Sequence, residues 1–260
     1  MIVNNIFNTK NHDLGNGNTL NIIEIDEIDG NLKNYLDEKL ISICYGPREI
    51  DISTVKLKIL KFLNSKKKTL NGVSDNTIVM GAITEFMVHL FLNSLNFVQE
   101  FTFKNLEEGS MKKGFDGYYS LEENCWIVES KSGSIQTKGN SHATKINEAY
   151  SGLIKMLEGK TNNSPWENAY NHSIMVNSKK SISDKLNELD INYTRGKFEN
   201  IKDFNIIPAS TMIYNNEWDN RCNNFEDEVI KAIDDFNYKN IRVICINKKS
   251  LSNFRKYLES

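Results

Sequence analysis

The chain has 260 residues and a formal net charge of −2, with 39% hydrophobic and 25% charged residues. These proportions are typical of a globular protein with a sizeable core, and the near-neutral charge excludes a protein that coats nucleic acid by bulk electrostatics. The sequence has no apolar run of about 18 residues, no basic leader and no CxxC pair. We therefore expect a cytoplasmic protein with no membrane association, no secretory signal and no structural zinc.

The N-terminal part predicts one strand and two helices. Residues 1–18 lack a regular pattern, and residues 20–28 alternate as a strand does. Helical spacing follows at 32–45 and at 54–63, where Ser53 is a candidate N-cap. The second helix and its tail carry lysines that form either a solvated face or a phosphate-contacting patch: Lys56, Lys58, Lys61, Lys66, Lys67 and Lys68.

Residues 77–95 show the strongest helical pattern, with an apolar face through Ile83, Met87 and Phe91. Glu85 interrupts this mostly apolar helix, and a carboxylate is expensive to bury unless it is paired or metal-bound. Two interpretations of Glu85 stay open. It faces solvent, or it adds an acidic ligand to a catalytic metal site formed by the strands that follow.

The stretch GFDGYYSLEENCWIVESKSG, residues 114–133, predicts two short strands joined by a polar turn. Side chains two apart on a strand share a face, so Glu129 and Lys131 point to one side and Val128 to the other. Asp116 lies at the start of the neighbouring strand. The hairpin therefore predicts two carboxylates and an ammonium group in one place.

These residue types point to phosphodiester hydrolysis. Asp116 and Glu129 supply the hard oxygen ligands that suit Mg²⁺ or Mn²⁺, and the backbone carbonyl of Ser130 is a candidate third ligand. A metal ion there would activate a water and neutralise developing phosphate charge, while Lys131 would orient or deprotonate that water. Phosphate contacts are expected from flanking lysines: Lys112, Lys113, Lys138 and Lys145.

The rest of the chain alternates helices and strands, which predicts one α/β unit with a mixed sheet. A helix at 141–157 is expected to cross to a strand at 173–176. After a short helix at 184–189, residues 204–214 predict a strand that Pro208 places at an edge or a bulge. The remaining expected elements are an acidic helix at 224–236, a buried strand at 241–246 and a helix at 251–258.

A D/E-x-K triplet is weak evidence by itself, because a chain rich in charge contains such triplets by chance. Three occur in this chain, but only Glu129–Lys131 ends a strand pattern and has an aspartate upstream. The histidines His89, His142 and His172 are too scattered to predict a ligand set. We interpret them as ordinary polar or semi-buried residues.

The segments GAITEFMVHLFL, GFDGYY and WIVESKSG resemble the PD-(D/E)XK nuclease superfamily and, more specifically, the HamA family of nuclease subunits from bacterial Hachiman antiphage systems. The late segments IIPASTMIY and IRVICINKKSLSNFRKYL are similar to that family's closing strands. Phe115 stands where the superfamily's name has proline. The resemblance implies a restriction-endonuclease-like core, a Mg²⁺-dependent deoxyribonuclease, and a superfamily 2 helicase partner that holds it inactive.

We expect residues 1–76 to form an extension packed on a nuclease core at 77–260, as one continuous domain. Two other functions stay open: a non-catalytic partner-binding subunit on a nuclease-derived fold, and a repair or restriction nuclease. The acidic helix at 224–236 or the N-terminal segment is expected to dock on a partner.

Overall fold

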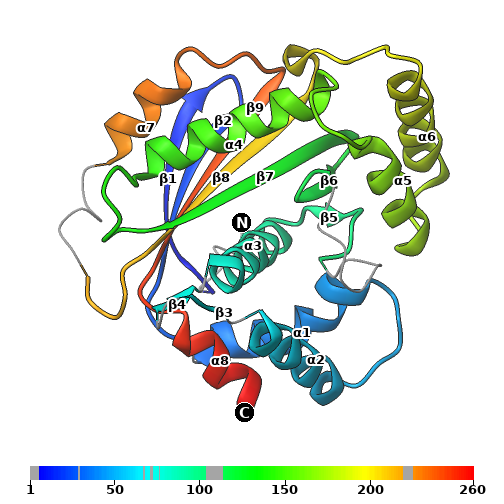
Figure 1. Cartoon of the computed structure of the whole chain (residues 1–260). Coiled ribbons are helices and arrows are strands. Elements are labelled where there is room, and N and C mark those ends of the chain that lie inside the picture. Colours follow the sequence, from blue (N-terminus) through cyan, green and yellow to red (C-terminus); the bar gives the residue numbers. More distant parts are fainter. Residues whose placement is uncertain are drawn as a thin grey trace.

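The structure is a computed structural model that describes residues 6–28, 30–66, 68–70, 73–75, 77–103, 114–218 and 225–260. A seven-stranded sheet runs in the order β1-β2-β9-β8-β7-β6-β5 (Figure 1). Its strands are β1 (Asn8–Gly15), β2 (Asn18–Ile25), β5 (Val98–Gln99), β6 (Gly117–Leu121), β7 (Asn124–Ser134), β8 (Asn205–Ile213) and β9 (Asn240–Lys248), and a separate pair contains β3 (Lys68–Leu70) and β4 (Val73–Asp75). β2, β9, β8 and β7 are parallel, and β1, β6 and β5 are antiparallel to their neighbours. The predicted α/β fold with a mixed sheet is thus confirmed, and it is consistent with a nuclease-like core.

Helices cover both faces of this sheet (Figure 1). One layer contains α1 (Gly30–Tyr45), α2 (Ile52–Ser65), α3 (Thr77–Ser94) and α8 (Ser252–Glu259), and the other contains α4 (His142–Leu157), α5 (Pro165–Met175), α6 (Lys180–Thr194) and α7 (Glu226–Ile233). Alternate residues of β9 serve the two layers: Ile244 and Ile246 join the core cluster with α1 and α3, and Val243 and Cys245 join the cluster with α4. Because both faces are buried, the central strands are nearly continuous apolar runs.

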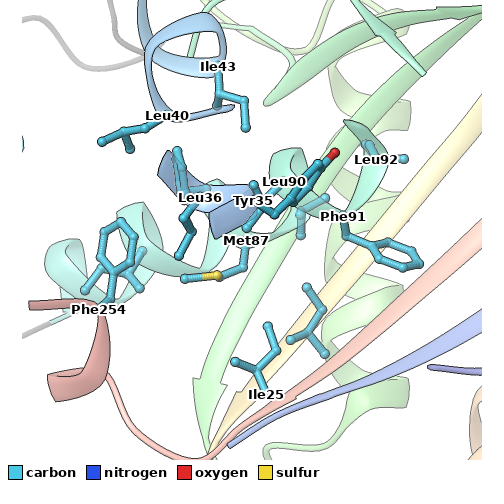
Figure 2. Packing of buried hydrophobic residues seen from close by; sticks show 14 of the residues in the cluster. Ile25, Tyr35, Leu36, Leu40, Ile43, Met87, Leu90, Phe91, Leu92 and Phe254 are labelled. Atoms are coloured by element: carbon cyan, nitrogen blue, oxygen red, sulfur yellow. The ribbon is translucent and has the colours of Figure 1, made fainter. Parts of the chain in front are cut away.

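α3 lies in the core of the first layer, as Figure 2 shows. Met87, Leu90 and Phe91 share one buried cluster with Leu36 of α1 and Phe254 of α8. The sequence predicted no apolar stretch long enough to cross a membrane, but α3 is long and apolar enough to do so by length and composition. Its packing in this cluster is that of a core helix.

The first two strands correct the expected irregular N-terminus. β1 and β2 pair antiparallel up to Gly15 and Asn18, and Asn16 and Gly17 form the turn between them with φ of 54° and 79°. Positive φ at both turn positions is what a type I′ hairpin requires, so these residues join two strands instead of ending regular structure. β2 then pairs in parallel with β9, so one sheet draws strands from before and after residue 76.

The strand expected at 173–176 is wrong, because these residues end α5 and follow it. Ser164 caps this helix, and Trp166, Ala169 and Ser173 are buried at helical spacing. The short apolar run was therefore the end of a helix, where Ile174 and Met175 are exposed and Ser173 is buried. The strand reached after α4 is β8, which pairs in parallel with β7.

Pro208 lies in the middle of the sheet, and its predicted place at an edge or a bulge is wrong. It stands opposite Glu129 of β7, and β9 lies on the other side of β8. The β8–β9 pairs stop at Ile206 and resume at Ala209 in unchanged register, so the ladder tolerates a local gap where proline lacks an N–H.

Helix ends were predicted less well than helices. The N-cap of α2 is Asp51 rather than Ser53, since Asp51 Oδ1 accepts from the Thr54 N–H at 2.8 Å. Ser141 caps α4, in agreement with its expected start. α6 is much longer than the expected helix at 184–189. Caps depend on side-chain geometry that the order of residues alone does not settle.

Candidate active site

β6 and β7 form the predicted hairpin and place the candidate residues at its open end. Their last ladder pair is Gly117 with Val128, and the Asp116 N–H still donates to the Val128 carbonyl at 3.0 Å. β7 runs on to Ser134, past the point where β6 begins. Asp116 therefore stands opposite Glu129, beside an edge of β7 that β6 no longer covers.

Ser130 fixes the orientation of the Asp116 carboxylate. Asp116 Oδ2 accepts hydrogen bonds from the Ser130 N–H at 2.8 Å and from the Ser130 hydroxyl at 2.9 Å. The N–H and C=O of one strand residue point to the same side, so the Ser130 carbonyl faces this edge as well. There it accepts from Lys131 Nζ at 3.3 Å. The carbonyl expected as a third ligand thus lies along the same edge as the Asp116 carboxylate.

Glu129 and Lys131 share one face of β7, and Val128 packs into the core on the other face. Lys131 Nζ forms an ion pair with Glu129 Oε1. Glu129 is only 7% exposed because α4 covers it. Gly152 permits this approach, since a Cβ at that position would lie 3.2 Å from Glu129 Oε1.

The two carboxylates make this edge unfavourable for a further negative charge. Burial raises the pKa of Glu129 to about 8, the charge of Asp116 adds to that effect, and Lys131 opposes it. Burial alone would lower the pKa of Lys131, but Glu129 and Asp116 outweigh burial and raise it, so the ammonium group stays charged at neutral pH. Among the described residues Glu129 Oε2 is buried without a hydrogen-bond partner. These oxygens fit a hard divalent cation, which binds one or two carboxylates and keeps several waters.

Glu85 comes from α3, on the other side of the sheet. Its Oε1 lies 3.5 Å from Nε2 of His89, whose Nδ1 is hydrogen-bonded to the Tyr119 hydroxyl. Gly117 makes room for that ring, since a Cβ there would lie 3.1 Å from the Cε1 of His89. The charge of Glu85 adds to the raised pKa of Glu129, so it acts on the site through space. In the part of the chain that the structure describes, no three His, Cys, Asp or Glu side chains gather as a metal-binding group.

The lysines expected to contact phosphates differ in their surroundings. Lys145 is held by Glu148, whose two carboxylate oxygens each accept from its Nζ at 2.9 Å, and its side chain is 13% exposed. Lys138 is exposed in the turn after β7. Lys112 and Lys113 lie outside the described residues.

The sequence reasoning missed a pocket beside Glu129 and Lys131. It has a volume of about 500 Å³, and α4 supplies most of its lining: Thr144, Asn147, Glu148, Ser151, Gly152 and Lys155. These residues recur at intervals of three and four, so a polar helical stripe was the signal that could have found them. The apolar stripe on the opposite side of that helix predicted the helix but not the pocket.

His89, His142 and His172 are buried rather than semi-buried, and they do not converge. His89 contacts Glu85, and His172 Nδ1 accepts from the Thr102 N–H at 3.2 Å. His142 lies under Phe225, with ring centroids 4.2 Å apart. Each of these imidazoles thus contacts a different part of the core.

A family model named HamA matches the sequence over residues 1–260, which is the full chain. A comparison with curated proteins finds no match to this chain. The matched region includes both helical layers, the whole sheet and the open end of the β6–β7 hairpin.

Proposed function

Because the chain belongs to the HamA family of Hachiman antiphage defence proteins, we propose that it is a metal-dependent deoxyribonuclease that acts on DNA in the cytoplasm. The observation that carries this proposal is the cluster at the open end of the β6–β7 hairpin, where Asp116, buried Glu129 and the Lys131 ammonium group share one edge. Oxygen ligands with a cation beside them are suited to Mg²⁺- or Mn²⁺-dependent phosphodiester hydrolysis.

The residues of this cluster have different proposed roles in metal binding, hydrogen bonding and positioning. Asp116, Glu129 and the Ser130 carbonyl would hold the metal ion, which when bound lowers the pKa of a water and offsets charge on the phosphate. Burial raises the pKa of Glu129 to about 8, so ligation of a metal ion must overcome the tendency of this carboxyl group to hold a proton. Lys131 keeps its proton and therefore donates hydrogen bonds to the attacking water or the phosphate. Ser130 holds Asp116 in place, which limits reorganisation during the reaction.

The test is cleavage of single- and double-stranded DNA by purified protein with Mg²⁺, freed of any partner. We expect Asp116→Asn, Glu129→Gln and Lys131→Met each to reduce the cleavage rate by at least about 100-fold, because each removes a group that acts on the reacting atoms. Matched controls are Glu123→Gln in the hairpin turn and Lys160→Met after α4, which change the same side-chain types at exposed positions.

Two outcomes would contradict this proposal. One is a wild-type protein that leaves both forms of DNA intact with Mg²⁺ or Mn²⁺. The other is a triple variant at Asp116, Glu129 and Lys131 that still protects cells from phage, which would favour a non-catalytic, partner-binding subunit.

We also propose that a superfamily 2 helicase partner restrains this activity and contacts α7. In support, Asp227 and Glu228 are exposed on that helix, whereas Glu226 is used inside the molecule by an ion pair of 2.6 Å with Lys10 of β1. A fair test therefore reverses Asp227 and Glu228 to lysine and leaves Glu226 intact. We expect weaker complex formation in co-purification, and an unchanged complex would argue against contact through α7.

A further inference from the structure

The polar stripe of α4 has the chemical character of a surface for a sugar–phosphate backbone. Thr144, Asn147 and Ser151 offer hydroxyl and amide groups, and Lys155 offers a cation, all in the pocket that contains Glu129 and Lys131. Among the described residues, the lining has no aromatic side chain and no Val, Leu, Ile or Met side chain. A stacked base needs such an apolar platform, whereas a phosphodiester backbone needs donors and cations.

A lysine that lines this pocket and a lysine beside it differ in whether a carboxylate neutralises them. Lys155 is exposed and forms no ion pair with any residue that the structure describes. Lys145 follows the lining residue Thr144 in the chain, and its Nζ donates to both carboxylate oxygens of Glu148. Gly133 of β7 makes space for it, since a Cβ there would lie 3.0 Å from Lys145 Cε.

Glu148 is the carboxylate that α4 adds to this lining, beside Glu129 of β7. It contributes to the negative environment of Lys131 as well as binding Lys145. A carboxylate in this position interacts with the same ammonium groups that a DNA phosphate would approach. It must lose these contacts, or repel the phosphate, when a strand enters.

We propose that the α4 pocket binds the sugar–phosphate backbone of the strand being cut, without base readout, and that Glu148 limits its affinity by competing with phosphate for Lys145 and Lys131. The proposal rests on the nuclease function proposed above and deepens it by naming where the strand lies. It also assigns opposite effects to two side chains of one helix face, Glu148 and Lys155.

The experiment measures binding of fluorescent DNA oligonucleotides of several sequences to the full chain carrying Asp116→Asn, which prevents cleavage. Adding Glu148→Gln is expected to tighten binding about two- to fivefold and to steepen the dependence on salt, because Lys145 becomes available. Adding Lys155→Gln is expected to weaken binding about fivefold, equally for every sequence, with a salt slope reduced by about one phosphate contact. Lys185→Gln on α6 is the matched control and should leave binding unchanged.

The results separate this inference from the function on which it rests. If the wild-type chain cleaves DNA but Glu148→Gln binds no more tightly, or Lys155→Gln weakens only some sequences, the strand does not lie in this pocket in the proposed way. If the wild-type chain neither binds nor cleaves DNA, the nuclease function fails and this inference fails with it. Circular dichroism of each variant checks that the fold is retained.

Discussion

Two polar regions lie side by side on the α4 face of the sheet. The first is the candidate active site on β7, and the second is the His142 network, which contains His142, Ser210, Tyr214 and Asn247. Lys131 of β7 pairs in register with Ser210 of β8, so the two regions lie on neighbouring strands. In the network, His142 Nδ1 lies 2.5 Å from the Ser210 hydroxyl, Nε2 lies 2.9 Å from Asn247 Oδ1, and the Tyr214 hydroxyl donates to that same oxygen at 3.0 Å.

The difference between them is whether a neighbouring strand covers the polar groups. The His142 network lies on β8 and β9, inside the sheet, and burial lowers the pKa of His142 to about 4, so the ring is neutral. Nε2 then donates to Asn247 and Nδ1 accepts from Ser210, which uses both ring nitrogens. At the active site β6 has ended and Glu129 keeps a buried oxygen without a partner among the described residues. Asn247 Nδ2 is also buried without a partner among the described residues, so an unpartnered atom alone does not distinguish the two regions. The active site differs because its carboxylates and its ammonium group lie where β6 no longer covers β7.

The largest expected effect is on the free energy of unfolding, and it comes from a change in the His142 network. His142→Ala leaves Ser210 and Asn247 without their buried partner and creates a cavity, so we expect the free energy of unfolding to fall by about 3 kcal/mol. DNA cleavage per folded molecule should stay within about twofold of wild type. Urea denaturation followed by fluorescence measures the first quantity, and a cleavage assay at low temperature measures the second.

A loss of cleavage without a loss of stability would instead show that the His142 network takes part in catalysis. If His142→Ala lost cleavage as severely as Asp116→Asn while unfolding at the same urea concentration as wild type, His142 would belong to the site. Ser210→Ala, which removes only one partner, is the milder control and should lose about 1 kcal/mol.

A second prediction uses pH and chelated, metal-free protein. Glu129 is protonated in the fold up to a pKa of about 8 but ionises near 4.5 in the unfolded chain, so the folded state holds the extra proton between these values. Stability should therefore fall as pH rises through this window, by up to about 1.4 kcal/mol per pH unit. Glu129→Gln should remove this slope, and Mg²⁺ should stabilise wild type more at pH 8 than at pH 6. Thermal unfolding across pH provides the measurement, and an identical slope in the variant would contradict the assignment.

The smallest expected effect concerns Glu85. The structure pairs it with His89 in the other helical layer, so it influences the site mainly through its charge. We expect Glu85→Gln to lower cleavage less than about tenfold, against at least about 100-fold for Asp116→Asn, because a charge across the sheet is a weaker term than a direct ligand. The measurement compares the DNA cleavage rates of the two variants at saturating Mg²⁺. Equal losses of rate would indicate that Glu85 is a metal ligand.

The candidate site was predictable from the sequence to the extent that it is local. Glu129 and Lys131 share a face because strand side chains alternate, and Asp116 meets Glu129 because a short turn sets the hairpin register. Glu85 was predicted only as two alternatives, since nothing in the residue order says which layer α3 joins. Lys145 was predicted to contact phosphates, and its ion pair with Glu148 became visible only on the folded helix.

By itself the sequence determined the alternation of helices and strands, the helical pattern of residues 77–95 and the facing of Glu129 and Lys131, because these depend on periodicity within a few residues. Tertiary structure decided the central place of Pro208, the helix at 165–175, the burial of His142 and the polar pocket along α4. Those features depend on contacts between residues far apart in the chain, such as β8 with β9 and α4 with β7, and a local pattern carries no information about such partners.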